Sequence, residues 1–327
     1  MEKCSIVTLT LNPAIDTSGE IERLVPGHKL RCSMGKRDPG GGGINVARVL
    51  RRLGMESLAV FPSGGTMGEF LTQLVCNEGL SHLVTKIAGE TRENLTVHDR
   101  ASGNQYRFVF AGPCISPPEL EACCETALSH LAPSSWLIAS GSLPAGAPDD
   151  TYAQLARRAA ALGARFVLDT SGAALRCAMK ERIYLLKASE QELAQASGEN
   201  VTDRASCIVA AQALIAHGPE TVAVSRGDQG ALYVGSDFVL SAAAPTITLA
   251  STVGAGDSFL AALVWQLVQE ASPNQALQWA IAAGSAALLS PGTELCHLSD
   301  IQRLLPIVHV QSLSSMALGN EAGAARM

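Results

Sequence analysis

Short apolar runs of the kind that form buried strands alternate with helical runs along most of the chain. Strand candidates lie at 58–61, 136–139, 165–169, 183–187 and 221–225, and helical runs at 118–131, 150–162 and 207–217 separate several of them. Repeated strand-helix-strand units build parallel sheets, because each crossover returns the chain to the same edge. The alternation therefore predicts an α/β fold in which helices flank a mostly parallel sheet.

Two segments, near 17–37 and 91–111, depart from this rhythm and have the pattern of short strands joined by turns. In the second segment Tyr106, Phe108 and Phe110 occupy alternate positions, as in a ribbon that buries one face. We interpret this aromatic stripe as the core of a small sheet formed by the two segments.

The length of 327 residues fits one α/β domain over 1–310 that carries these two insertions. The last residues, 311–327, are small and polar and are expected to form a flexible tail. The apolar runs are too short to span a bilayer, and the N-terminus leads into a strand-like alternation instead of a signal peptide. We therefore expect a cytoplasmic protein with no membrane span.

Charge and cysteine usage exclude further classes of protein. The formal net charge of −6 argues against nucleic-acid binding, and the nine cysteines include no C-x-x-C pair that would indicate a zinc site. The charge is nevertheless uneven, since residues 1–52 hold nine Lys/Arg against five Asp/Glu. This basic end would suit a small anionic substrate, although a solvated basic face is the plainer explanation.

The stretch 251–258 places a carboxylate, Asp257, directly behind the turn Gly254-Ala255-Gly256 and before an apolar helical run. Small residues allow backbone N–H groups to surround an anion at the positive end of a helix. A carboxylate at that point can take a proton from an attacking hydroxyl, which is what phosphoryl transfer requires. The alternative is that the glycines only shape a turn and Asp257 only caps the helix.

A second glycine cluster, Pro39 to Arg48 with glycine at each position of 40–43, precedes the first by roughly 200 residues. In this order the two clusters resemble the two signatures of the PfkB-type sugar kinases, a ribokinase-like family, and the resemblance extends from about Ile6 to His309. It implies a ribokinase-like fold in which the two irregular segments form a small β-sheet lid over the sugar. It also implies a homodimer joined through the lids.

The resemblance implies a role for each motif residue. Asp257 would be the general base, and the amides of Gly254, Ala255 and Gly256 would form the anion hole. Lys29 and Arg92 would bind a substrate phosphate. The full set of implied substrate-binding residues is Asp16, Lys29, Gly41, Gly42, Asn45, Arg92, Arg107 and Ser142. Surface charge would equally explain the basic members, and a turn cap would explain Asp16.

Mg-ATP is the second reactant that the resemblance implies. A loop from Ser225 to Gly230 resembles the family's loop over the ATP phosphates, although its Gly-Asp-Gln-Gly sequence is also an ordinary hairpin turn. The implied ATP-binding residues are Lys187, Ser225, Gly227, Gly230, Thr252, Ala283, Gly284 and Ala287.

Two metal sites follow from the resemblance, and at both the chain departs from the family pattern. Glu192 would organise Mg²⁺ through water, but its usual partner Asn is replaced by Ser189, and Ser-x-x-Glu is also a capping box. A monovalent cation such as K⁺ would bind carbonyl groups near the anion hole, at Ser251, Val253, Ala287, Ser290 and Gly292. Beside that stretch, Glu294 stands where similar members tend to carry Arg.

The unbroken glycine run bears on the substrate. Family members that phosphorylate fructose 1-phosphate or tagatose 6-phosphate commonly have Lys within this run, and this chain does not. The pattern resembles members that convert fructose 6-phosphate to fructose 1,6-bisphosphate, so an ATP-dependent kinase for that sugar is predicted, with the other two sugars as alternatives. The departures at Ser189 and Glu294 leave a second class of function open, a non-catalytic sugar-phosphate sensor.

Overall fold

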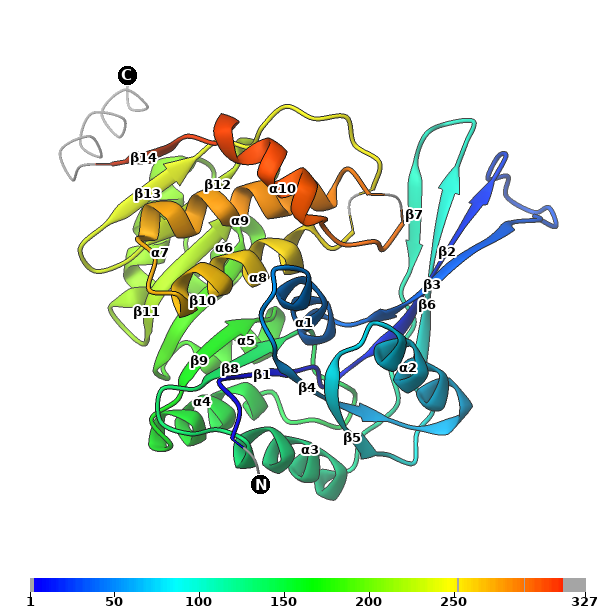
Figure 1. Cartoon of the computed structure of the whole chain (residues 1–327), viewed down its shortest axis with the longest axis horizontal. Helices are drawn as coiled ribbons and strands as arrows, with labels where there is room; N and C mark the ends of the chain where they lie inside the picture. Colours follow the sequence, from blue (N-terminus) through cyan, green and yellow to red (C-terminus); the bar gives the residue numbers. More distant parts are fainter. Residues whose placement is uncertain (1–2, 252, 291, 314–327) are drawn as a thin grey trace.

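The computed structural model describes residues 3–251, 253–290 and 292–313, and its largest element is a ten-stranded sheet (Figure 1). The strands lie in the order β14-β13-β12-β11-β10-β9-β8-β1-β4-β5. Their bounds are β1 Ile6–Leu9, β4 Leu58–Ser63, β5 Ser81–Lys86, β8 Trp136–Ser140, β9 Arg165–Asp169, β10 Ile183–Ser189, β11 Pro219–Ser225, β12 Ala231–Val234, β13 Val239–Ala242 and β14 Val310–Ser312.

From β5 through β11 each neighbouring pair in this sheet is parallel, and only the edge strands β12, β13 and β14 pair antiparallel. Every residue of β4 and β8 is buried, as expected of strands covered on both faces. The five strand candidates correspond to β4, β8, β9, β10 and β11, so the predicted mostly parallel sheet is confirmed.

Helices cover both faces of the sheet. Their bounds are α1 Gly42–Arg52, α2 Gly65–Asn77, α3 Pro117–Ser129, α4 Thr151–Ala161, α5 Gly172–Ala178, α6 Glu190–Ser197, α7 Arg204–Ile215, α8 Ala255–Val268, α9 Pro273–Ala287 and α10 Leu298–Leu304. Successive residues of a strand face opposite sides. Thus Leu137 and Ala139 of β8 pack in one core cluster with α3 to α7, while Trp136 and Ile138 pack in the other with α1, α8, α9 and α10.

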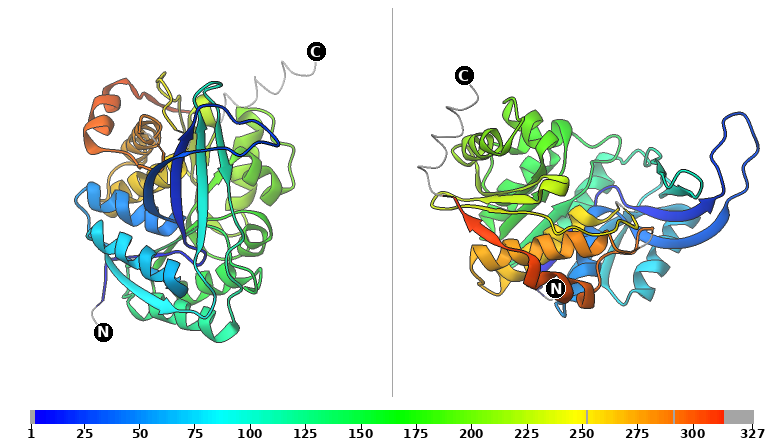
Figure 2. Two further views of the ribbon diagram at one scale, coloured as in Figure 1. Left: turned by 90° about the vertical axis from the view of Figure 1, so that its right-hand side faces the viewer. Right: turned by 90° about the horizontal axis from the view of Figure 1, so that it is seen from above.

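A separate four-stranded sheet, the lid, has the order β3-β2-β6-β7 and extends from one end of the body (Figure 2). Its strands are β2 Ala14–Ile21, β3 Ser33–Gly40, β6 Arg92–Asp99 and β7 Gln105–Phe108. The predicted small sheet is confirmed, but its aromatic stripe is not its core. Phe108 is 44% exposed and Phe110 is 57% exposed, because β7 is an edge strand and no described element packs over these two side chains.

The predicted tail begins too early. Gln311 and Ser312 belong to β14 and pair with Ser241 and Leu240 of β13, whereas 314–327 lies outside the described residues. The nine cysteines all lie in the described part of the chain, and no disulfide joins them there. No helix among the described residues is long and apolar enough to cross a bilayer.

Helix α8 is apolar on every side because it lies between the sheet and the helices α1 and α9. We expect Leu260→Ala, at a fully buried position of α8, to lower the free energy of unfolding by about 2–5 kcal/mol through a cavity in the core. The control is Leu162→Ala, since Leu162 is 42% exposed, and it should change stability by less than about 1 kcal/mol. Denaturant titration measures both, and equal losses would contradict the packing described for α8.

Candidate active site

Polar side chains form a row where the parallel strands end. Ser140 of β8 lies opposite Asp169 of β9 in the sheet register, and Asp169 lies opposite Lys187 of β10. The Lys187 ammonium is 3.0 Å from Asp169 Oδ1, and the Ser140 hydroxyl donates to Asp169 Oδ2 at 3.3 Å. Burial alone would lower the pKa of Lys187, but the charge and hydrogen bond of Asp169 raise it. The lysine is therefore a fixed cation at the carboxyl edge of the sheet.

The N-termini of α1 and α8 meet this row. Gly41 precedes α1 with φ 110°, a conformation that side chains other than glycine rarely adopt. A Cβ on the next residue, Gly42, would lie 2.1 Å from Ser140 Oγ, so only glycine allows α1 to begin so close to β8. At the start of α8, a Cβ on Gly256 would lie 3.0 Å from Lys187 Nζ. The turn Gly254-Ala255-Gly256, predicted to form an anion hole, thus begins α8 beside a buried cation.

Asp257 joins the two helices. Its Oδ2 accepts a hydrogen bond of 2.9 Å from Nδ2 of Asn45 in α1. Burial, together with the nearby charge of Asp169, raises the pKa of Asp257 to about 6, although the Asn45 hydrogen bond and the Lys187 charge act in the opposite direction. Such a carboxylate is ionised at neutral pH yet basic enough to accept a proton from a hydroxyl.

Asp16 and Arg92 lie at the root of the lid. Asp16 Oδ1 accepts a hydrogen bond of 2.8 Å from Asn94 Nδ2, and burial raises the pKa of Asp16 although the charges of Arg107 and Arg92 oppose the shift. The Arg92 guanidinium donates to the carbonyl oxygens of Asn12 at 2.9 Å and Phe110 at 3.0 Å. These contacts hold a carboxylate and a guanidinium near the same end of the sheet as Asp257, whose pKa the charge of Asp16 also affects.

Ser142 and Lys29 are placed differently. The Ser142 hydroxyl accepts a hydrogen bond of 3.1 Å from Asn12 Nδ2, so it lies beside the residues that hold Arg92. Lys29 is exposed in the connection between β2 and β3, which forms the outer tip of the lid in Figure 2. The fold of one chain therefore does not bring Lys29 to the other predicted substrate-binding residues.

A cavity of about 600 Å³ opens beside the start of α8, between the turn after β11, the segment 244–249 and α9. The predicted residues Ser225, Gly227, Gly230 and Gly284 line it, and its walls are mainly apolar. Its apolar walls suit an aromatic ring, and Ala255 and Gly256 of the first turn of α8 also line it.

Three predicted nucleotide-site residues need correction or lie outside the described part of the chain. Ala283 and Ala287 are fully buried in the core between α8, α9 and α10 and do not line this cavity. They share α9 with Gly284, but the rotation of the helix directs Ile281, Gly284 and Ser285 towards the cavity instead. Thr252 lies outside the described residues.

Ser189 and Glu192 form a capping box at the start of α6. The Ser189 N–H donates to Glu192 Oε2 at 2.7 Å, and the Glu192 N–H donates to Ser189 Oγ at 3.3 Å. The alternative explanation for Ser-x-x-Glu therefore holds, yet the Glu192 charge is close enough to contribute to the raised pKa of Lys187. Within the described ranges, no group of three or more His, Cys, Asp or Glu side chains could hold a metal ion unaided.

The predicted monovalent-cation residues lie on two neighbouring loops. Ser251 Oγ donates to the Gly292 carbonyl at 2.6 Å and accepts from the Val253 N–H at 3.2 Å. Ser290 N–H donates to the carbonyl of Ala287, the last residue of α9. The nearby Glu294 lies 3.8 Å from Lys36 of lid strand β3 and 3.5 Å from His297, so this departure from the family pattern is an ion pair with the lid.

Asp169, which was not predicted as a site residue, contacts Lys187, and its charge acts on Asp257. Its position offered a signal, since it ends a predicted buried strand in the same way as Lys187 does. Arg48 was also missed, because the pattern of α1 marks only its apolar face.

The model of the pfkB family carbohydrate kinases matches residues 1–300. The chain belongs to the PfkB family of carbohydrate kinases. Among its relatives is the ATP-dependent 6-phosphofructokinase isozyme 2 of Escherichia coli, 38% identical over 91% of this chain and 97% of that protein. A 1-phosphofructokinase of Xanthomonas campestris is 36% identical over 92% of this chain and 93% of that protein.

Solved structures agree with this assignment. The E. coli phosphofructokinase-2 in complex with potassium matches with a TM-score of 0.89 and 37% identity over 94% of this chain and 99% of that one. This confirms the predicted ribokinase-like fold with its small lid. The same E. coli enzyme has been solved in a tetrameric inhibited form. The comparisons therefore do not confirm the predicted homodimer.

The raised pKa of the partly buried Asp257 carboxylate leads to a prediction about stability. Because folding raises its pKa from 3.8 to about 6, the folded state favours the protonated acid, and the stability gained in this way is present below about pH 4 and lost as the pH rises through 6. We expect Asp257→Asn to raise the free energy of unfolding at pH 8 by roughly 1–3 kcal/mol, with little effect at pH 4.

Thermal unfolding at both pH values measures this difference. Asp149→Asn, at an exposed aspartate before α4, is the control and should be neutral at either pH. A loss of stability of Asp257→Asn at pH 8 would contradict the electrostatic description of the site.

Proposed function

We propose that the protein is an ATP-dependent sugar-phosphate kinase that converts fructose 6-phosphate to fructose 1,6-bisphosphate. The observation that carries this proposal is the position of Asp257. It lies at the N-terminus of α8 beside Lys187 and is held by Asn45, and the cavity suited to a nucleotide opens at the same helix end. The named activity of the E. coli relative supports the choice of sugar.

Asp257 is the general base of the proposed reaction. It takes the proton from the sugar hydroxyl, whose oxygen attacks the γ-phosphorus of ATP, and the bond from that phosphorus to the β-γ bridging oxygen breaks to release ADP. The backbone amides of 254–256 and the ammonium of Lys187 balance the charge on the transferring group. Glu192, whose charge already acts on Lys187, would organise the water ligands of a nucleotide-bound Mg²⁺, and that ion would supply further neutralisation of phosphate charge.

On the sugar side, Asp16 and Asn45 bind hydroxyls, and the backbone of Gly41 and Gly42 allows the sugar a close approach. Arg92 binds the sugar phosphate, and its two backbone hydrogen bonds hold the guanidinium in place for a forked contact. Arg107 and Ser142 lie near enough to assist. Fructose 1-phosphate and tagatose 6-phosphate remain the alternative substrates, the former because the X. campestris relative carries that name.

We further propose that two chains pair through their lids. Three consecutive apolar side chains are exposed along β7 and just after it: Phe108 at 44%, Val109 at 60% and Phe110 at 57%. A second lid would remove this surface from water. It would also bring Lys29, which stands at the tip of one lid, towards the active site of the other chain. A monovalent cation near Ser251 and Gly292, and a cytoplasmic location, complete the proposal.

An assay of ADP release tests the activity. With Mg-ATP and K⁺, turnover should be highest on fructose 6-phosphate when tagatose 6-phosphate, fructose 1-phosphate, fructose and ribose are compared. Replacing K⁺ with Na⁺ should lower it. Asp257→Asn should reduce kcat by roughly 10² or more, since a positioned base is lost. A rise in melting temperature with fructose 6-phosphate but no turnover on any sugar would favour the sensor function instead.

Sedimentation of a lid variant tests the proposed dimer. Phe108→Asp adds a charge to the exposed apolar surface of β7 and should convert the dimer to a monomer without unfolding the chain, because Phe108 is not in the core. The matched control is Val209→Asp on α7, where a 56% exposed apolar residue lies in the body of the protein. A Phe108→Asp protein that keeps the mass of the parent would argue against pairing through the lids.

A further inference from the structure

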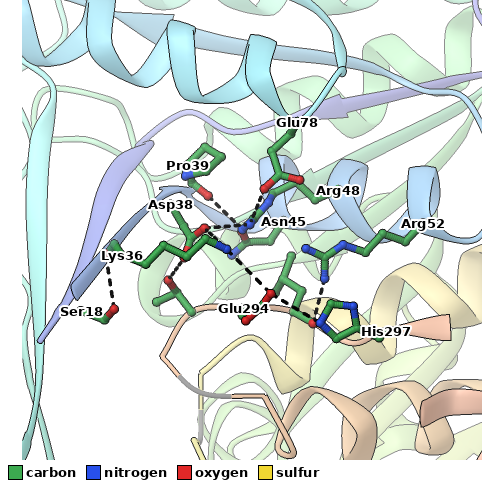
Figure 3. Close-up of polar contacts among 12 residues, drawn as sticks. Ser18, Lys36, Asp38, Pro39, Asn45, Arg48, Arg52, Glu78, Glu294 and His297 are labelled. Carbon is green, nitrogen blue, oxygen red and sulfur yellow. Dashed lines mark hydrogen bonds and ion pairs between the residues drawn. The ribbon is translucent and has the colours of Figure 1, made fainter. Parts of the chain in front are cut away.

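Arg48 is a charged side chain in the interior of the protein. It lies in the middle of α1, is 1% exposed, and is among the largest fully buried side chains (Figure 3). Its Nη2 is 2.8 Å from Glu78 at the end of α2 and 3.3 Å from Asp38 of lid strand β3. Its Nη1 donates to the Pro39 carbonyl and to Asn45 Oδ1, both at 3.3 Å. One guanidinium therefore connects α1, α2 and the root of the lid.

A buried ion pair is a weak source of stability, because removing charges from water costs about as much as their attraction returns. An apolar residue would fill this part of the core at least as well, so packing alone does not explain an arginine. The contact with Asn45 does offer an explanation, since Asn45 also holds Asp257 at 2.9 Å. The arginine is one hydrogen-bonded residue away from the proposed base.

The chemistry of the three groups fixes the orientation of the amide. Arginine can only donate hydrogen bonds, and an ionised carboxylate can only accept them. The Asn45 oxygen must therefore face Arg48, and its NH₂ group must face Asp257. Without a donor at Arg48 the amide is free to turn over, and its oxygen would then lie against the Asp257 carboxylate and favour the protonated acid.

We propose that Arg48 is a positioning residue of the phosphoryl-transfer site, which holds the amide of Asn45 so that its NH₂ group binds the base Asp257. The inference rests on the proposed function, because it concerns the base of that reaction. Arg48 does not touch the reacting atoms and acts only through Asn45.

The arginine is itself held firmly. Asp38, 2% exposed, accepts a hydrogen bond of 2.7 Å from the Thr293 hydroxyl and lies 3.1 Å from the Lys36 ammonium. Thr293 follows Gly292 in the loop bonded to Ser251, just before the anion hole. The orientation of Asn45 thus depends on a network that joins the root of the lid to the loops beside α8.

The test is the pH dependence of kcat. The charged groups that act on Asp257 are Asp169 of β9, Lys187 of β10 and Asp16 of β2, and none of them is changed in Arg48→Met. We expect this variant to move the pH of half-maximal kcat upwards by about 0.5–1 unit. Activity at pH 6.5 then falls by a factor of about 1.5 to 3 through ionisation and recovers at pH 8.5. A purely structural defect would lower kcat by the same factor at every pH and would overturn the proposal.

A double-mutant cycle shows whether the effect passes through Asn45. Asn45→Ala should shift the profile as Arg48→Met does, and the double variant should shift it no further. Additive shifts would overturn the proposal and indicate that the arginine acts by its charge alone, for example on Asp16, whose pKa it also lowers.

The control is Arg51→Met, which removes an arginine from the same helix that is exposed and paired with Glu56 on the surface. Its profile should match the parent. If Arg48→Met does not fold, Arg48→Lys keeps a charge beside Asp38 and Glu78. It lacks the second nitrogen, which in arginine donates to Asn45, so this variant should still raise the pH midpoint of kcat. A profile of Arg48→Lys identical to the parent would overturn the proposal. Turnover of fructose 6-phosphate by the parent and by Arg51→Met tests the proposed function separately.

Discussion

The hydrogen bond between Asn45 and Asp257 is the contact on which the site depends. It joins the first turns of α1 and α8, which are 212 positions apart in the chain, above the carboxyl edge of the parallel sheet. Both helices direct their N-terminal, positive ends towards this edge of the sheet, where they would stabilise the phosphate groups of the proposed substrates. Glycine at Gly42 and Gly256 allows the helix ends to lie against Ser140 and Lys187. The remainder of the fold holds these two helix ends in place.

The site concentrates charges that a stable core would exclude. Asp257, Asp169, Lys187 and Arg48 are all largely or fully buried, and burial penalises each charged form. The core around these groups is apolar. Every residue of strands β4 and β8 is buried, and helix α8 is largely buried as well. Buried charges of this kind lower the stability of a protein, and proteins retain them where the function requires them.

Local patterns were reliable where one face or one end of an element decides the outcome. The parallel strands were predicted because strands buried on both faces have continuous runs of apolar residues. The lid segments were predicted because half-buried strands have apolar residues at alternate positions. The aromatic stripe of 106–110 was misinterpreted because alternation reveals that a face is apolar but not what covers it. Ala283 and Ala287 were misplaced because small residues occur on all sides of α9, and only the packing of that helix selects Gly284 for the cavity.

The sequence by itself determined the fold class, the family and the two glycine motifs, because strand burial, tight turns and helix ends depend on residues close together in the chain. The tertiary structure alone decided which of these residues meet. It paired Lys187 with Asp169, buried Arg48 among three elements and kept Lys29 at the tip of the lid. Contacts of this kind depend on the register of strands and the rotation of helices, and these are properties of packing between distant segments and not of any local pattern.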